Sequence, residues 1–462
     1  MKKSARAGVA AQAMGDDYLA TYEKRTPKSK ALHEKSRKVT PGGISHNNRY
    51  HSPYPVYFAG AKGSRLKDVD GNDYLDLWMA HYDAILGHAP PRVVEAVKAA
   101  MDNGLHIGLS MEHEIGLAER VTQFVPAAEQ VRFCTSGTEA TMYAVRLARG
   151  FTGKNTIIKM VGGWHGANTD LLVDVSPPEY IGAEGKGLTP EVAKYTRSVQ
   201  FNDIEDTARV IREIGDDWAC VIIEPAMGST GFIPVEQDYL AFLKEEAKKA
   251  GALIIFDEVI TGFRLGLGGA QEYFNFTPDL VTMGKVLGGG MPIGAIGGRA
   301  DVLGISSVEA KGGKADKLVI GGGTYSTNPL TMISGTLTLD ILHERREKIY
   351  GTIAGRNHRL CEGIRSHFDH VGIPVHVNEI GSLQEVHFLK EAGLPLRNMA
   401  DVIENTYMEK RIELATRLRN HGVFLFHAGA VSYAHSDEDI ELIIDAYGRC
   451  AQEMAGAKSK AR

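Results

Sequence analysis

The sequence has little of several features that would assign it to a particular class of protein. Its 462 residues include only 4 cysteines and 3 tryptophans, and acidic residues outnumber Lys and Arg, which gives a formal net charge of -5. Because nucleic-acid-binding domains usually present a basic stripe, no nucleic-acid partner is expected. No apolar run reaches the length of about 18 residues that suggests a transmembrane helix, so no membrane partner is expected.

The four cysteines match no metal-binding spacing and no disulfide framework. They are Cys134, Cys220, Cys361 and Cys450. They are typical of reduced, buried thiols in a cytoplasmic protein, and no metal site is predicted. Residues 1–14 lack an apolar core long enough for a signal peptide, so a disordered tail is expected there.

Two short apolar runs end abruptly in ionisable residues. Residues 253–256 stop at Asp257, and residues 280–283 lead through Gly284 into Lys285. Such runs predict buried parallel strands whose carboxyl ends meet at the ligand-binding edge of an open sheet. The pair suits pyridoxal phosphate, because a lysine can join the aldehyde while an acid keeps the pyridine nitrogen protonated. A buried Asp–Lys ion pair is the alternative for these two residues alone.

A third run, residues 131–134, leads into Ser136, Gly137 and Thr138 and then into an apolar-periodic helix. A strand followed by small hydroxyl residues and a helix N-terminus describes a phosphate cradle. The same residues are also typical of an ordinary N-cap, and the two interpretations are compatible.

Two more predicted strands end in residues with useful chemistry. Residues 156–161 lead into Trp164 between glycines, where an indole could lie flat on a planar ring, and residues 220–223 stop at Glu224. A core tryptophan is the alternative for the first. Because all these strand ends should share one sheet edge, their convergence favours a cofactor site over unrelated caps and ion pairs.

The sequence also resembles the class III pyridoxal-phosphate aminotransferases over about residues 40–445. The residues that carry the resemblance are Ser136-Gly137-Thr138-Glu139-Ala140, Asp257-Glu258-Val259-Ile260-Thr261-Gly262-Phe263-Arg264, Gly284-Lys285 and Gly322-Gly323-Thr324-Tyr325 with Asn328-Pro329. Thr261 to Arg264 and Pro41-Gly42-Gly43 are most similar to the branch that contains glutamate-1-semialdehyde aminomutase.

That resemblance implies an α/β, fold-type I enzyme: a large domain with a mostly parallel seven-stranded sheet and a smaller α+β domain. It implies a homodimer with active sites at the subunit interface. The residue roles that it implies are Lys285 as Schiff-base lysine, Asp257 as partner of the pyridine nitrogen, Ser136, Gly137 and Thr138 at the phosphate, Trp164 and Val259 on the ring faces, His165 and Glu224 near the cofactor, and Thr324 at the phosphate of the neighbouring subunit. A flexible loop is the alternative for the glycine run before Thr324.

The substrate residues are less strongly marked. Arg49 aligns with the arginine that holds the substrate carboxylate in the aminomutase branch, and a surface arginine is the alternative. Where aminomutases have Phe-Glu-Ala-Gly, this chain has Phe426-His427-Ala428-Gly429. His427 is therefore either a substrate-binding residue or a packed loop histidine. Arg264 is expected to form a structural ion pair.

The loss of that acid favours an aminotransferase that moves an amino group between an amino acid, such as a β-amino or aromatic one, and a keto acid. A glutamate-1-semialdehyde 2,1-aminomutase is the second hypothesis, and a cofactor-less binding protein on the same fold is the third.

The expected organisation has three parts: residues 1–60 as an N-terminal segment, 61–335 as the large cofactor-binding domain and 336–462 as the small domain. The expected elements are helix-compatible residues 15–40, a hairpin at 64–77, a surface excursion at 176–198, helices at 91–101, 239–250, after Pro329 and at 401–420, strands at 375–377, 383–388 and 422–426, and a frayed C-terminal helix.

Overall fold

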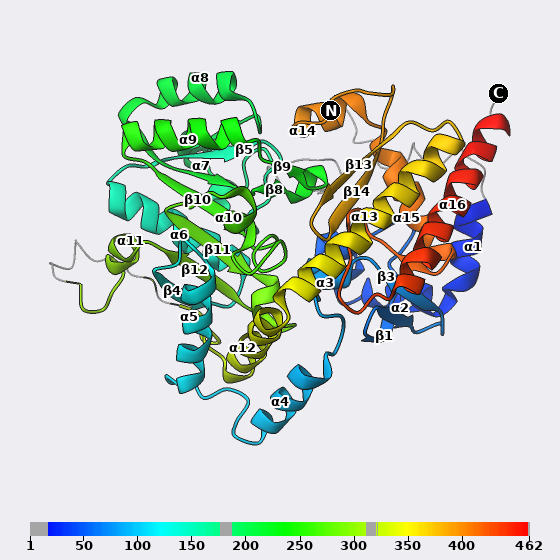
Figure 1. Ribbon diagram of the computed structural model, residues 1–462, viewed down its shortest axis with the longest axis horizontal. Coiled ribbons are helices and arrows are strands. Elements are labelled where there is room, and N and C mark those ends of the chain that lie inside the picture. Colours follow the sequence, from blue (N-terminus) through cyan, green and yellow to red (C-terminus); the bar gives the residue numbers. More distant parts are fainter. Residues whose placement is uncertain (1–16, 176–186, 311–319, 321, 461–462) are drawn as a thin grey trace.

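The computed structural model describes residues 17–175, 187–310, 320 and 322–460. The chain forms two lobes that lie side by side in Figure 1, and α12 (Pro329–Glu344) followed by α13 (Arg346–His370) leads from one to the other. The predicted tail at 1–14 and residues 176–186 of the predicted excursion lie outside the described residues. The domain boundaries predicted above stay a prediction.

The left lobe of Figure 1 contains a seven-stranded sheet in the order β4-β12-β11-β10-β7-β5-β6. Its strands are β4 (Gln130–Cys134), β5 (Thr156–Met160), β6 (Thr196–Val199), β7 (Trp218–Ile223), β10 (Leu253–Glu258), β11 (Leu280–Gly284) and β12 (Gly294–Gly298). Only β12 is antiparallel to its neighbours. The predicted mostly parallel sheet is confirmed. Strand β6 lies where a surface excursion was predicted, and that part of the prediction is wrong.

Helices cover both faces of this sheet, which explains why its strands are continuous apolar runs. The helices are α6 (Gly137–Thr152) on one face and α8 (Ile204–Ile214) with α9 (Gln237–Ala250) on the other. Side chains alternate between the faces: Val221 and Phe256 pack with α8 and α9, whereas Ile222 and Ile255 pack with α6. The carboxyl ends of β4, β5, β7, β10 and β11 therefore share one edge.

The right lobe of Figure 1, which is the small lobe, combines the C-terminal part of the chain with its N-terminal part. One sheet has the order β13-β14-β16, and the other has the order β1-β2-β3-β15. The strands are β13 (Val375–Ile380), β14 (Leu383–Phe388), β16 (Gly429–Ala430), β1 (Phe58–Lys62), β2 (Arg65–Asp68), β3 (Asp73–Asp76) and β15 (Val423–Phe424). The predicted hairpin is confirmed as the antiparallel pair β2 and β3.

The N-terminal helices are fastened to this lobe. Within the predicted helix-compatible stretch 15–40, the described residues form α1 (Asp17–Arg25) and α2 (Pro27–Ser36), which are separated at Thr26. The Arg25 guanidinium donates to the carbonyl of Asn420 at 2.6 Å, and the Asn420 side chain donates to the carbonyl of Tyr18 at 2.8 Å. These hydrogen bonds join α1 to the C-terminal part of the chain.

The helices predicted at 91–101, at 239–250 and after Pro329 are confirmed, whereas the one predicted at 401–420 differs from the structure. Helices α4 (Pro91–Met101) and α9 match their predictions. The single helix predicted at 401–420 is α14 (Met399–Asn405) followed by α15 (Met408–Asn420), because the backbone amide of Tyr407 donates to the Phe388 carbonyl at 2.8 Å and the connection is extended. Helix α16 (Asp437–Lys460) continues through the segment predicted to fray.

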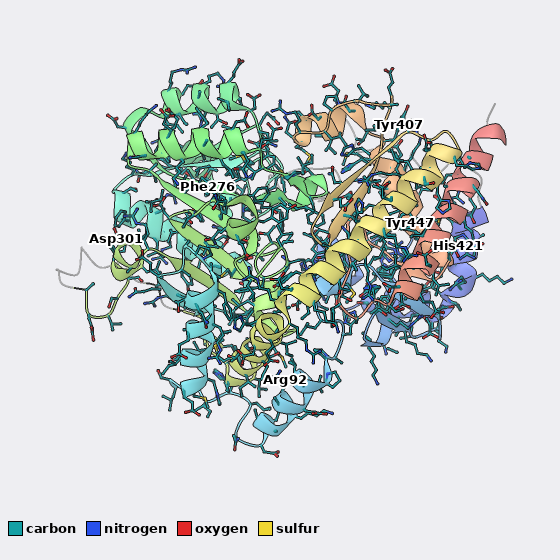
Figure 2. All side chains as sticks on the ribbon, in the orientation of Figure 1. Arg92, Phe276, Asp301, Tyr407, His421 and Tyr447 are labelled. Carbon is teal, nitrogen blue, oxygen red and sulfur yellow. The ribbon has the colours of Figure 1, made fainter. Side chains whose placement is uncertain are left out.

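The right lobe has a hydrophobic core of its own, whereas the core of the left lobe extends to Ile380 and Leu383 of the right lobe. Figure 2 labels Phe276 in the left lobe and Tyr447 in the right lobe, and the two side chains belong to different clusters of buried residues. All four cysteines are unpaired and buried, as predicted. Within the described ranges, no helix is both long and apolar enough to cross a membrane.

Candidate active site

One cavity of about 600 Å³ brings together almost all of the predicted site residues. It lies at the carboxyl edge of the seven-stranded sheet. The predicted residues that line it are Arg49, Gly137, Thr138, Trp164, His165, Glu224, Asp257, Val259, Lys285 and His427. A larger groove of about 770 Å³ near Pro234 and Gly381 is lined by none of them. The convergence inferred from the strand ends is therefore present in the structure.

Asp257 stands at the end of β10 and accepts three hydrogen bonds. Its Oδ1 accepts from Thr282 Oγ1 at 2.9 Å and from the backbone amide of Val259 at 3.1 Å. Its Oδ2 lies 2.7 Å from His165 Nδ1. Because Asp257 is buried, these contacts fix the direction of the carboxylate within the cavity. Sequence reasoning missed Thr282, whose only signal is its register opposite Asp257 in β11.

Lys285 follows β11 directly, in a left-handed backbone conformation with φ of 46°. Burial lowers the pKa of its ammonium group, and the nearby carboxylates of Asp257, Glu224 and Asp83 act in the opposite direction. A larger share of the amine is therefore neutral than for a lysine in water, and a neutral amine can act as nucleophile or base.

The N-terminus of α6 meets the same cavity. Ser136 caps the helix by accepting a hydrogen bond from the Glu139 amide at 3.2 Å, so the N-cap interpretation is confirmed for Ser136. Gly137 and Thr138 follow it and line the cavity, whereas Ser136 does not. The dipole and N–H groups of a 16-residue helix favour an anion at this position.

Glu224 and Trp164 come from neighbouring strands and are joined. Oε1 of Glu224 accepts from the Trp164 amide at 2.9 Å, and Oε2 accepts from the Gly228 amide at 3.1 Å. Burial raises the pKa of the Glu224 carboxyl. Trp164 lines the cavity rather than lying in the core, and its stacking on a planar ring stays a prediction.

The other side of the cavity is formed by irregular segments. Arg49 comes from the loop after α2 and His427 from the loop after β15, and Trp78 and His81 join them from the segment after β3. The rings of Trp78 and His81 are 4.2 Å apart between centroids, and those of Trp78 and His427 are 5.5 Å apart. Sequence reasoning missed Trp78 and His81, because neither ends a recognisable apolar run.

Thr324 and Arg264 do not line this cavity. Thr324 is exposed and does not line this cavity, so its predicted contact with the cofactor of a neighbouring subunit stays a prediction. Arg264 forms no direct ion pair with any described carboxylate, and that expectation is wrong. It donates instead to the carbonyl of Tyr82 at 2.5 Å, to Ser382 Oγ at 3.0 Å and to the carbonyl of Val431 at 3.4 Å.

The residues of the cavity fit pyridoxal phosphate, the cofactor implied by the resemblance. A carboxylate, a lysine and a helix N-terminus line one space, as this cofactor's ring nitrogen, aldehyde and phosphate require. Gly166 closes the cradle tightly: a Cβ there would lie 2.3 Å from Thr138 Oγ1. The buried Nε2 of His165 has no hydrogen-bond partner among the described residues, which leaves a polar atom available near the ring.

Comparisons with known proteins show the family to which the chain belongs. The profile of the Aminotransferase class-III family matches residues 46–449. A glutamate-1-semialdehyde 2,1-aminomutase of Methanopyrus kandleri is 38% identical over 442 residues, which cover 94% of this chain and 100% of that enzyme. Other relatives of the same name are 35% to 39% identical.

Solved structures give the same fold. An omega-transaminase from Sphaerobacter thermophilus superposes with a TM-score of 0.85 at 32% identity, covering 95% of this chain and 99% of that one. A structure described as a transaminase with PLP bound has a TM-score of 0.83 at 31% identity, covering 94% and 99% of the two chains.

Proposed function

The chain belongs to the class-III aminotransferase family, with the fold-type I architecture and pyridoxal 5'-phosphate as cofactor, and from this premise we propose that it is an aminotransferase. It would move an amino group from an amino acid to a keto acid. The observation that carries the proposal is the single cavity in which Lys285, Asp257 and the N-terminus of α6 face Arg49.

The roles of the residues follow from their positions. When bound, the cofactor supplies an aldehyde and an electron-accepting ring. Asp257, oriented by its three hydrogen bonds, would hold the proton on the ring nitrogen. The Lys285 amine, once the substrate amine has displaced it, would move a proton between the substrate carbon and the cofactor carbon. Gly137 and Thr138 would hold the phosphate, and Trp164 and Val259 would enclose the ring. Glu224 and His165 would lie near its remaining polar groups.

Arg49 gives the site its preference for acids. Its planar guanidinium matches a carboxylate with two parallel hydrogen bonds. It lines the same cavity as Lys285, and both cations act on His81, so a substrate held by Arg49 would present its amino group toward Lys285. His427 would contact the same substrate from the small lobe.

An aminomutase is the second candidate, and the curated relatives favour it over intermolecular transfer. Shifting an amino group within one molecule passes through a compound that carries two amino groups, which must stay bound until one is returned. Among the described residues lining the cavity, the carboxylates are Glu224 and Asp257, both on the cofactor side. The side of Arg49 and His427 therefore has no acid to retain a second amine, and this favours intermolecular transfer.

Dependence on a keto acid distinguishes the two candidates. Purified holoenzyme is incubated with a panel of amino acids, with and without pyruvate or 2-oxoglutarate, and product amines are measured. The aminotransferase requires the added keto acid for turnover. Conversion of glutamate-1-semialdehyde to 5-aminolevulinate without any keto acid would instead support the aminomutase. A protein that gains no visible absorbance band with added cofactor would be a binding protein on this fold.

We further propose that two copies assemble so that Thr324 reaches the partner's cofactor phosphate. Thr324 is exposed and shares a hollow of about 600 Å³ with Leu109, which is itself 74% exposed. Leu105 and Tyr325 nearby in sequence are 58% and 63% exposed. Exposed apolar side chains of this size favour a protein interface. Light scattering should give a dimer, and Thr324→Ala should weaken cofactor binding without changing the oligomer.

The proposed function also suggests where the protein acts and which molecules it binds. Four buried, unpaired cysteines suit a reducing compartment, so we place the enzyme in the cytoplasm. Its partners would be the amino donor, the keto acid and a second copy of the chain. A formal net charge of -5 supports neither a nucleic-acid nor a membrane partner.

A further inference from the structure

The substrate side of the cavity has an aromatic wall centred on Trp78. The indole is 4.2 Å from the His81 ring, 5.5 Å from the His427 ring and 5.1 Å from the Phe426 ring, measured between centroids. His46 adds a further ring 5.3 Å from that of His81. The wall thus combines side chains from the N-terminal loop, the segment after β3 and the small lobe.

His81 is held in this wall by an unusual backbone turn. Residues Met79, Ala80, His81 and Tyr82 have φ values of 43°, 54°, 61° and 69°. Each left-handed residue other than glycine costs about 1–2 kcal/mol, so the surrounding structure must stabilise the turn. Met79 is fully buried at one end, and the Tyr82 carbonyl accepts from Arg264 at the other. The position of His81 is therefore maintained against local preference.

The wall carries almost no charge. Burial lowers the pKa of His81 to about 3, with Lys285, His46 and Arg49 contributing, and burial with Arg411 lowers that of His427 to about 3. Burial and Arg49 also lower the pKa of His46. These imidazoles are neutral at physiological pH, whereas a guanidinium does not deprotonate in proteins. Among the described residues that line the cavity, Arg49 is the one arginine. Arg411, which acts on His427 from outside the lining, is paired with the buried carboxylate of Glu385.

We propose that Trp78, His81 and His427 determine substrate specificity by receiving a flat, uncharged side chain, so that the substrate has one carboxylate and the amino acceptor is a monocarboxylic keto acid. This inference rests on the proposed aminotransferase function and names its substrate class. An aromatic ring can pack against the indole and imidazole faces. The buried Nε2 of His81, without a hydrogen-bond partner in the described part of the chain, can meet a neutral polar group of the substrate.

A dicarboxylate substrate should bind less tightly, because the aromatic wall offers no charge to its second carboxylate. Its first carboxylate would occupy Arg49, and its second would lose water beside neutral rings with no cation to compensate it. Burying a carboxylate without a paired charge is costly. The same arrangement accepts pyruvate more readily than 2-oxoglutarate.

Binding of unreactive acids to the holoenzyme tests this without turnover. The probes are 3-phenylpropionate, glutarate and propionate, and the readout is the change in the cofactor's visible band together with calorimetry. We expect 3-phenylpropionate to bind at least about 10-fold more tightly than glutarate. Trp78→Leu should weaken 3-phenylpropionate by about 10-fold while leaving propionate, which reports on Arg49 alone, unchanged.

The most decisive variant places a second cation on the substrate side of the cavity. His427→Arg should tighten glutarate by about 10-fold or more and reverse or remove the preference. His370→Arg, with the same charge change at an exposed position, is the matched control and should leave the order unchanged. His81→Arg is the second variant if His427→Arg loses its visible band.

The inference is overturned if the wild type binds glutarate as tightly as 3-phenylpropionate. It is also overturned if a folded, coloured arginine variant leaves the ratio unchanged. Either result would leave the proposed function intact, because the visible band and amine transfer are measured separately. Absence of that band in the wild type would instead contradict the proposed function.

Discussion

The two sides of the cavity are built by different means. On the cofactor side, the ends of neighbouring strands place Asp257, Lys285 and Glu224, and backbone amides and hydroxyls fix the carboxylates. On the substrate side, loops and a left-handed turn place Arg49, His81 and His427. In the proposed function, the chemistry would thus depend on the sheet, whereas the choice of substrate would depend on irregular segments that can change without disturbing the sheet.

Removal of the Lys285 side chain should have the largest effect of any substitution on the cofactor side of the cavity. Lys285→Ala should abolish the visible band and lower amine transfer by at least about 10³-fold, because both the covalent link and the base are lost. Absorbance spectra and steady-state rates measure both effects. Lys249→Ala, at an exposed position on α9, is the control and should behave as the wild type. Normal turnover by the Lys285→Ala protein would mean that the reaction does not depend on the lysine at the sheet edge.

Substitution of Arg49 should affect binding rather than chemistry. Arg49→Gln should raise KM for the amino acid by about 10- to 100-fold, since a charged hydrogen bond contributes about 1.5–3 kcal/mol. The visible band should not change. Arg209→Gln, on the exposed face of α8, is the matched control. An unaltered KM would support the alternative interpretation, in which Arg49 is a surface arginine.

Gly166, beside Thr138, and Gly153, at the C-terminal end of α6, together test how tightly the phosphate cradle is packed. Gly166 and Gly153 have similar φ values of 76° and 70°, but a Cβ at Gly166 would meet Thr138 Oγ1 at 2.3 Å, whereas nothing lies within 4 Å at Gly153. Gly166→Ala should weaken cofactor binding by about 10-fold, because Thr138 must move. Gly153→Ala should cost only about 1 kcal/mol of stability from its backbone. Equal cofactor titrations for the two variants would contradict the tight cradle.

The smallest effect concerns the neutral imidazoles. The folded protein holds the pKa of His427 at about 3, below its usual 6.5. The unfolded chain therefore binds more protons between these values, and stability falls as the pH falls from about 6.5. Between pH 7 and pH 5, the wild type should lose about 1–2 kcal/mol more than His427→Gln in urea unfolding. The exposed His370→Gln is the control, and equal losses in all three proteins would mean that His427 is not kept neutral.

The sequence predicted that the strand-end residues would come together, and there is a physical reason for this. A buried parallel strand is a continuous apolar run, so the residue that ends it, such as Asp257 or Lys285, is visible without a structure. Trp78 and His81 have no such marker, because their positions depend on tertiary contacts with Arg264 and the small lobe. Strand β6 was missed because it lies at the sheet edge and is only partly buried. Arg264 was misread because a buried guanidinium can be satisfied by carbonyl and hydroxyl oxygens.

Arg264 links the turn to the small lobe, since one guanidinium contacts Tyr82, Ser382 and the Val431 carbonyl. Substitutions near Ser382, remote from the reacting atoms, should therefore shift which acids are accepted before they impair cofactor loading. Evolution could retune this enzyme through its scaffold, leaving Lys285 untouched.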